Sequence, residues 1–84
     1  MNRESAIVVF NITKRKISVD LEIPLYITAN ELVMALNTAY ALGIDTSDIK
    51  NCYLKAENPI ALLKGNKTLD EFGLRNGSVI NYTE

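Results

Sequence analysis

Between Thr28 and Leu42, apolar side chains recur at intervals of three and four residues, which is the period of an amphipathic α-helix. Thr28 followed three positions later by Glu31 is the pattern of a capping box, which satisfies free backbone N–H groups at a helix start. Gly43 suits the left-handed conformation that closes a last helical turn. The sequence therefore predicts one central helix. Its apolar face is expected to consist of Leu32, Ala35, Leu36, Ala39 and Tyr40.

Segments on both sides of this helix carry the patterns of β-strands. The first is an unbroken β-branched and aromatic run, the second alternates strictly between apolar and polar residues, and three later ones are shorter. Near Leu69–Phe72 the sequence predicts a single helical turn that Gly73 ends. Together these elements predict an α+β fold, with a mixed four- to five-stranded sheet packed on one central α-helix. The predicted strands cover residues 6–12, 17–23, 52–56, 60–63 and 78–83.

Within each strand, alternate residues are expected to face the helix and to form the core with its apolar face. The residues between them are expected to face solvent. The inward-facing set is Val8, Phe10, Ile12, Ile17, Val19, Leu21, Ile23, Cys52, Leu54, Leu63, Leu69, Leu74, Ile80 and Tyr82.

Length and composition narrow the class of protein. A chain of 84 residues is expected to form a single domain over residues 1–84, with the polar residues 1–5 frayed at its start. The hydrophobic fraction of 48% argues against disorder, and no apolar run reaches the ~20 residues of a membrane-spanning helix. The net charge of −1 gives no general attraction to nucleic acid. These properties predict a small cytoplasmic protein.

Residues that could carry catalysis or bind a cofactor are sparse. The sequence has no histidine, and its single cysteine, Cys52, alternates with core residues and has no neighbouring base. A lone cysteine cannot form an internal disulfide, which fits a reducing compartment. Asp45 and Asp48 lack the further ligands and the glycine of a calcium-binding loop. We therefore expect no catalytic residues, no metal site and no cofactor, and a protein that is not an enzyme.

The order of the predicted elements resembles the β-grasp, or ubiquitin-like, fold over nearly the whole chain. The most specific part is residues 67–80, where a Thr-Leu pair and a short turn with an aromatic and an aliphatic residue lead into the last strand. Within this superfamily the chain is similar to the YukD/EsaB family, small bacterial proteins that accompany type VII (WXG100, ESX-like) secretion systems. The segments that carry this narrower resemblance are residues 19–24, 27–32 and 74–80.

The resemblance implies a function and a class of partner. It implies a ubiquitin-like protein-interaction module that is an accessory or regulatory component of a bacterial type VII secretion system. In actinobacterial systems a similar domain is fused to a membrane channel component, so cytosolic parts of the membrane complex are candidate partners. The implied partners are proteins, without nucleic acid and without direct insertion into the membrane. A weak homodimer stays open.

The end of the printed sequence bears on conjugation. Protein modifiers and sulfur carriers of this superfamily end in a flexible tail with a terminal Gly-Gly that enters an adenylating enzyme. Here the last strand ends at Tyr82-Thr83-Glu84, so a complete product would lack such a tail. The expectation is a non-conjugated module. The alternative is a sulfur-carrier or protein-modifier relative that lacks the terminal Gly-Gly.

Apolar residues that alternation turns away from the helix are candidates for partner binding. In a β-grasp the first strand is central, next to the last, which in turn lies next to the third. That order would cluster apolar residues on the solvent side, with two basic residues at the rim, and such a patch is typical of an interaction surface. Scattered apolar residues on a partly shielded sheet face are the alternative. The candidate residues are Ile7, Val9, Tyr53, Lys55, Arg75 and Val79.

Lys14, Arg15 and Lys16 form the one dense run of charge. Such a run is typical of a solvated turn that discourages association between hairpins. The alternative is an electrostatic contact with an acidic protein surface or with lipid headgroups. Three charges at ~1 kcal/mol each would bind a membrane only weakly, so a protein is the preferred partner for this secondary basic contact.

Overall fold

The computed structural model describes residues 4–48 and 52–83. The elements are β1 (Ser5–Ile12), η1 (Thr13–Arg15), β2 (Ile17–Pro24), α1 (Ala29–Tyr40), β3 (Leu54–Glu57), β4 (Ala61–Leu63) and β5 (Val79–Tyr82). The strands form one five-stranded sheet in the order β2-β1-β5-β3-β4. β1 and β5 run parallel and the other neighbouring pairs are antiparallel, so the sheet is mixed, as predicted.

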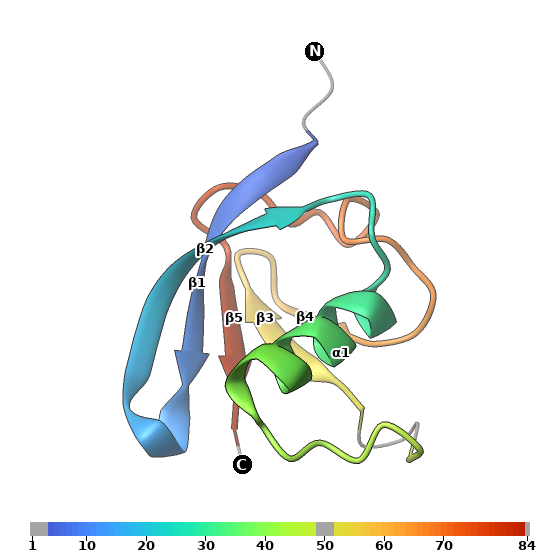
Figure 1. The fold of residues 1–84 in the computed structure, drawn as a ribbon. Helices are drawn as coiled ribbons and strands as arrows, with labels where there is room; N and C mark the ends of the chain where they lie inside the picture. The colour runs from blue at the N-terminus through green and yellow to red at the C-terminus, as the bar shows by residue number, and fades with distance from the viewer. Residues whose placement is uncertain (1–3, 49–51, 84) are drawn as a thin grey trace.

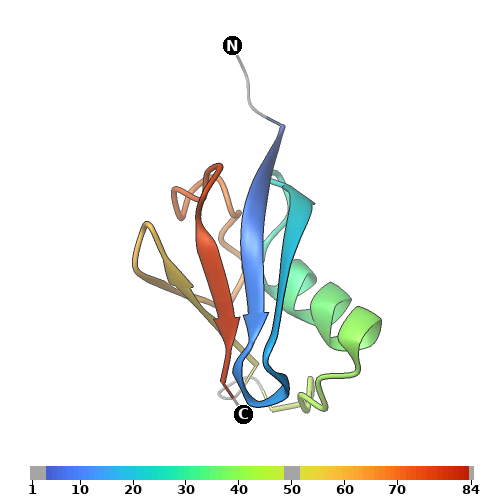
Figure 2. The same ribbon diagram turned by 90° about the vertical axis from the view of Figure 1, so that its left-hand side faces the viewer.

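The core lies between α1 and one face of the sheet. Figures 1 and 2 show α1 on a single side of the strands. Beneath it, Val8, Phe10 and Ile12 of β1 are fully buried. The Phe10 ring lies 5.3 Å from the Tyr40 ring, centroid to centroid, at an interplanar angle of 56°. Tilted pairs of this kind are favourable arrangements of two aromatic rings. The predicted two-layer α+β architecture is confirmed.

α1 begins where the sequence predicts. The Thr28 hydroxyl accepts a hydrogen bond from the Glu31 N–H at 3.1 Å, and the Thr28 N–H donates to Glu31 Oε1 at 3.1 Å. These two bonds form the predicted capping box. The Ala29 N–H, in the first turn, donates to the Lys67 carbonyl at 2.9 Å. The start of the helix is therefore tied to the loop that follows β4.

α1 ends before the predicted boundary at Leu42. Ala41 takes the left-handed conformation, with φ of 51°, and its N–H donates to the Asn37 carbonyl. The Asn37 side chain accepts from the Ile44 N–H at 2.9 Å and donates to the Ile44 carbonyl at 3.1 Å. Gly43, with φ of 77°, lies in the loop beyond the helix. The prediction that Gly43 closes the last turn is wrong, because the Asn37 side chain draws the following loop back and the helix ends at Ala41.

The buried face of α1 is rotated from the predicted one. Leu32 and Leu36 are buried as predicted, but Val33 is buried as well, whereas Ala35 and Ala39 are exposed. Burial of a valine removes more apolar surface from water than burial of an alanine, so this rotation is the more stable packing.

Among the described residues, no helix is both long and apolar enough to cross a membrane.

Two predictions for the first hairpin also need correction. Ile17, predicted to lie in the core, is 36% exposed, because the hairpin end of the edge strand β2 lies to the side of α1 (Figure 1). Ser5, predicted to be frayed, is the first residue of β1, and its hydroxyl donates to Glu22 Oε2 at 2.7 Å. The rest of that prediction, for residues 1–3, falls outside the described residues.

The segment after β4 forms the predicted turn near Leu69–Phe72, but it is a single hydrogen-bonded turn and too short for a helix. The Phe72 N–H donates to the Thr68 carbonyl at 3.2 Å. The Thr68 hydroxyl accepts from the Glu71 N–H at 3.3 Å, and the Thr68 N–H donates to Glu71 Oε1 at 3.3 Å. Gly73, with φ of 84°, ends the turn as predicted. This segment therefore carries a second capping box.

Candidate interaction surface

The face of the sheet turned away from α1, here called the outer face, carries part of the predicted surface. Val9 of β1 lies opposite Val79 of β5, and both side chains are half-buried. Ile7, two residues before Val9 on the same face, is 54% exposed. We call Ile7, Val9 and Val79 the apolar trio. The described residues of the chain leave this trio partly open to solvent.

Carboxylates flank the apolar trio on both neighbouring strands. On β2, Glu22 and Asp20 lie opposite the two β1 members of the trio. On β3, Glu57 lies opposite the β5 member. All three acidic residues are exposed. The apolar trio is thus a strip between acidic side chains, whereas the sequence predicts a patch with basic residues at its rim.

Arg75 belongs to the turn at one end of the trio. In that turn, Asn76 Oδ1 accepts a hydrogen bond from the Ile7 N–H at 2.8 Å, and the Gly77 N–H donates to the Ile7 carbonyl at 3.0 Å. These bonds hold the turn that precedes β5 against β1. Arg75 itself is exposed. The backbone of the turn that contains Arg75 therefore lies beside Ile7, at one end of the apolar trio.

Tyr53 lies towards the other end of the outer face. Extending the β3–β5 register by two residues sets Tyr53 beside Thr83. Ile7 is level with Gly77 in the β1–β5 register, so Tyr53 and Ile7 are six positions apart along the strands, which is about 20 Å at ~3.3 Å per residue. Lys55 lies between them, opposite Asn81 and two residues along β5 from Val79. The six predicted residues therefore spread along the outer face and do not form one compact cluster.

A row of hydrogen-bonded polar side chains crosses the outer face between Tyr53 and the apolar trio, at the level of Lys55. Asn11 Nδ2 donates to Asn81 Oδ1 at 2.9 Å, and Asn81 Nδ2 donates to Glu57 Oε2 at 2.9 Å. The row connects β1, β5 and β3 through side chains as well as through the backbone. Because these groups satisfy one another, this strip of the face is polar and divides the surface in two.

Leu62 and Ile60 are exposed apolar residues that the predicted surface does not include. Leu62 of β4 lies opposite Lys55 on the outer face and is 41% exposed, and Ile60, just before β4, is 91% exposed. They help to line a shallow groove beside Asn81. Alternation contains the signal for Leu62, since its neighbour Leu63 is predicted to face the helix. The Tyr53 end of the face is therefore more apolar than the sequence analysis indicates.

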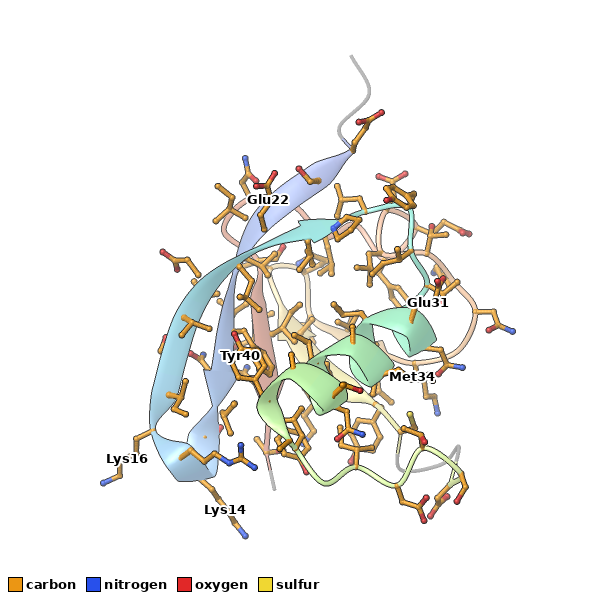
Figure 3. The ribbon with its side chains drawn as sticks, in the orientation of Figure 1. Lys14, Lys16, Glu22, Glu31, Met34 and Tyr40 are labelled. Atoms are coloured by element: carbon orange, nitrogen blue, oxygen red, sulfur yellow. The ribbon has the colours of Figure 1, made fainter. Side chains whose placement is uncertain are left out.

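The predicted basic contact is divided in the structure. Lys14 and Lys16 are exposed at the tip of the β1–β2 hairpin and point away from the rest of the molecule (Figure 3). Arg15 instead reaches α1, where Nη1 donates to the Tyr40 carbonyl at 2.6 Å and Nη2 donates to the Ala41 carbonyl at 2.8 Å. The guanidinium thus binds carbonyls at the negative end of the helix dipole. Lys14 and Lys16 keep the exposure that an external contact needs.

Groups with potential chemistry occupy structural positions. Cys52 is a buried free thiol. Asp45 Oδ1 accepts from the Ser47 hydroxyl at 2.6 Å and from the Ser47 N–H at 3.0 Å, and these bonds lower the pKa of Asp45. Across residues 4–48 and 52–83, no group of three or more His, Cys, Asp or Glu side chains could hold a metal ion.

Comparison with known proteins gives one family and one fold. The family model described as "WXG100 protein secretion system (Wss), protein YukD" matches residues 7–81. No curated protein matches the sequence.

The similar solved structures are ubiquitin-like domains. A ubiquitin-like domain from tubulin-binding cofactor B has a TM-score of 0.74 and 16% identity, and the match covers 96% of this chain and 90% of that one. The C-terminal ubiquitin-like domain of mouse tubulin-specific chaperone e has a TM-score of 0.69 and 12% identity, with 95% and 86% covered. The UBL domain of Plasmodium falciparum Dsk2 has a TM-score of 0.59 and 18% identity, with 92% and 96% covered. These matches confirm the ubiquitin-like β-grasp fold.

Proposed function

The chain belongs to the YukD family of the WXG100 protein secretion system, and from this premise we propose that it is a non-covalent protein-interaction module of that system. In this proposal it is an accessory or regulatory component that works in the cytoplasm and docks onto cytosolic parts of the membrane complex. Family membership supports the link to the pathway. The ubiquitin-like fold supports a role in binding other proteins.

The observation that carries the proposal is the apolar trio on the outer face. Binding energy at interfaces concentrates in a few apolar anchors, surrounded by residues that contribute less. Ile7 is 54% exposed and is the most accessible anchor of the trio. Three carboxylates flank the apolar trio, those of Asp20, Glu22 and Glu57. A matching partner therefore presents an apolar side chain that is surrounded by lysine or arginine.

The Tyr53 end of the outer face supplies a second, separate contact in this proposal. Tyr53 is half-buried, and Lys55 lies beside it with Leu62 opposite. A tyrosine ring offers apolar area together with a hydroxyl, a combination that is common at interfaces. Lys14 and Lys16, at the hairpin tip, would act mainly on the rate of association, because exposed charges steer an encounter more than they hold a complex.

We also propose that the protein performs no catalysis. The support is chemical: the sequence lacks histidine, the Cys52 thiol is buried, and the Asp45 carboxylate is engaged by Ser47. General acid–base or nucleophilic catalysis needs an accessible reactive group with a partner that moves its proton.

The alternative is a modifier or sulfur carrier of the same superfamily. The intact mass of the protein isolated from its host separates the two. A modifier would appear in part as an isopeptide adduct and a carrier as a thiocarboxylate. The proposed module would appear at the mass of the unmodified polypeptide.

Secretion by the host tests the proposed function. The gene is deleted, and the amount of a WXG100 substrate in the culture medium is measured after complementation with wild type, Ile7→Asp or Met34→Asp. Ile7→Asp puts a charge into the apolar trio, whereas Met34→Asp puts one on α1, at a side chain that is 53% exposed on the other side of the sheet. We expect wild type and Met34→Asp to restore secretion and Ile7→Asp to fail.

Two results would contradict the proposal. If deletion leaves secretion unchanged, the protein is not a component that the system needs. If Ile7→Asp restores secretion as well as wild type while circular dichroism shows it folded, the apolar trio is not the binding site. Tyr53→Ala, tested in parallel, reports on the second contact independently.

A further inference from the structure

β2 is an edge strand with a row of backbone groups turned outward. Within the described residues it pairs with β1 alone. The Val9 N–H donates to the Ser78 carbonyl at 2.9 Å, so the backbone of Val9 faces β5 rather than β2. In an antiparallel pair, the residue opposite it, Asp20, then directs its own N–H and C=O to the free edge. Ser18 and Glu22, two residues away in each direction, direct theirs the same way.

The side chains along the β2 edge of one copy are complementary to those along the β2 edge of a second copy. On the inner face, Ile17 is 36% exposed and Val19 and Leu21 are half-buried, because the β2 edge extends beyond α1 (Figure 1). Lys16 directly precedes β2, and Glu22 lies near the other end of the strand (Figure 3). A strand with opposite charges at its two ends matches a second copy that runs antiparallel to it, because unlike charges then lie opposite each other.

We propose that the β2 edge is a self-association site, at which β2 of a second copy pairs antiparallel with Val19 on the twofold axis. In this register Ser18 of each copy lies opposite Asp20 of the other. Both residues direct their backbone groups outward, so they exchange an N–H···O=C bond in each direction. The small Ser18 side chain also leaves room for the Asp20 carboxylate and can donate its hydroxyl to it.

The remaining side chains match in the same register. Lys16, in the turn directly before β2, comes next to the end of the paired region, where its long side chain can reach Glu22 of the other copy. On the inner face, Ile17 lies opposite Leu21, and the two Val19 side chains meet at the axis. These contacts would cover apolar surface that a single copy leaves partly open.

Other pairings of this edge bring like charges together or overlap less. With the axis at Asp20, the two Asp20 carboxylates lie opposite each other, which is destabilising. A parallel pairing in register sets Asp20 beside Asp20 and Glu22 beside Glu22. With the axis at Ser18, Lys16 meets Asp20, but Glu22 and its backbone groups fall outside the paired region. The axis at Val19 is the arrangement that avoids these defects.

This pairing engages Asp20 and Glu22 but leaves the apolar trio itself, on β1 and β5, uncovered. The twofold axis is perpendicular to the sheet, so both α1 helices lie on one side of a continuous sheet and both apolar trios lie on the other. A dimer would therefore present two copies of the surface described above, which raises affinity for a partner with repeated sites. Stable interfaces bury about 1,200–2,000 Å² of accessible surface, and one pair of strand edges buries less than this. The dimer is therefore weak, and its population depends on protein concentration.

Sedimentation equilibrium of the full chain tests the charge pairing. The wild-type protein is measured at concentrations up to about 1 mM, and dimers are expected to form within this range. Such weak association fits an interface below the standard size. Glu22→Lys sets two cations opposite each other and should raise Kd about tenfold. The double variant Lys16→Glu, Glu22→Lys restores unlike charges and should recover the wild-type Kd. Asp70→Lys makes the same change in net charge at an exposed site outside the paired segment and should leave Kd unchanged.

Disulfide trapping tests the register. In a Cys52→Ala background, Val19→Cys should cross-link, because residues on the axis of a non-hydrogen-bonded pair have Cα atoms about 4.5 Å apart. Leu21→Cys is the matched control, since its two copies would lie about 13 Å apart along the strands. Cys52 is buried, so the same trap can be run with Cys52 in place if the background variant does not fold.

The proposal is supported by a Val19→Cys cross-link together with the loss and recovery of dimerisation in the charge variants. It is overturned by a wild-type protein that stays monomeric and does not cross-link through Val19→Cys. A dimer that Glu22→Lys leaves intact, or that Asp70→Lys weakens equally, also overturns it. Cross-linking through Asp20→Cys in place of Val19→Cys overturns the register.

Discussion

The same pair of side chains, a threonine followed three positions later by a glutamate, starts both α1 and the turn after β4. In each case the threonine hydroxyl and N–H both donate to the glutamate carboxylate. At the second site these bonds lower the pKa of Glu71, first through the Thr68 hydroxyl, then through the Thr68 N–H, with the charge of Lys67 a smaller cause. Hydrogen bonds between side chains one turn apart thus stabilise both the start of α1 and the turn after β4.

Glu71→Gln should change how stability depends on pH. Because the folded pKa of Glu71 is below its ordinary value of 4.5, the stabilisation by its carboxylate is complete above that value and is lost as pH falls through the lowered folded pKa. Urea unfolding across neutral to strongly acidic pH should show the largest difference between wild type and variant at neutral pH, and a vanishing one in acid. Thr68→Val also removes the oxygen that accepts from the Glu71 N–H, so part of its destabilisation should persist in acid. Curves that stay parallel through the acid range would contradict this origin.

Leu36→Ala should destabilise the protein by about 2–5 kcal/mol, because it leaves a cavity where a buried side chain was. Ala35→Ser changes the adjacent residue, which is exposed, and should shift the free energy of unfolding by no more than about 0.5 kcal/mol. Denaturant unfolding of the two variants compares the observed helix face with the predicted one. Equal effects of the two changes would mean that the helix packs through a different face.

The residues of the helix and of the surface were predictable to different degrees. Leu32 and Leu36 are large and spaced by one turn, so a periodic pattern is enough to identify them. Ala35 and Ala39 are small, and a pattern cannot say whether the packing favours them or a larger neighbour such as Val33. For Tyr53, alternation along one strand does not give its distance from a residue on another strand.

Arg15 joins two elements that are distant in sequence. It lies in η1, at the tip of the β1–β2 hairpin, and its two hydrogen bonds reach the Tyr40 and Ala41 carbonyls at the end of α1. α1 has no basic residue of its own in its last turn. The hairpin therefore supplies the positive charge that stabilises the carbonyl end of the helix.

Arg15→Ala should lower the free energy of unfolding by about 1 kcal/mol, since it removes a charged donor from two carbonyls at an exposed position. Arg15→Lys keeps the charge but not the two-pronged geometry and should lose less. Lys14→Ala, in the same turn, should change stability by no more than about 0.5 kcal/mol. If Arg15→Ala and Lys14→Ala have the same effect in urea unfolding, the contact with α1 contributes nothing measurable.

The order and the type of the elements were predictable, and their ends were less so. The capping box marks the start of α1 with residues that are local in sequence, and it is confirmed. The end of α1 depends on Arg15, which comes from another element, and on the Asn37 side chain, which bonds the loop beyond. Contacts of that kind form only once the chain has folded, so they leave no local pattern in the sequence. The glycine pattern therefore predicted that the helix closes at Gly43, whereas it closes at Ala41.

Considered as a whole, the molecule has a covered face and an uncovered one. α1 and the core occupy one side of the sheet (Figure 2). The other side carries the apolar trio with its flanking carboxylates, a polar row, and the Tyr53 site. The trio sits in the centre of the sheet on β1 and β5, away from the free edge of β2, so partner binding and self-association could occur together.

Binding to the membrane complex addresses the proposed function most directly. Wild type, Ile7→Asp and Met34→Asp are immobilised and exposed to the detergent-solubilised type VII membrane complex of the host, and the retained subunits are quantified by mass spectrometry. We predict that wild type and Met34→Asp retain the complex equally and that Ile7→Asp, still folded by circular dichroism, retains about tenfold less. Equal retention by all three proteins, or retention by none, would contradict docking through the apolar trio.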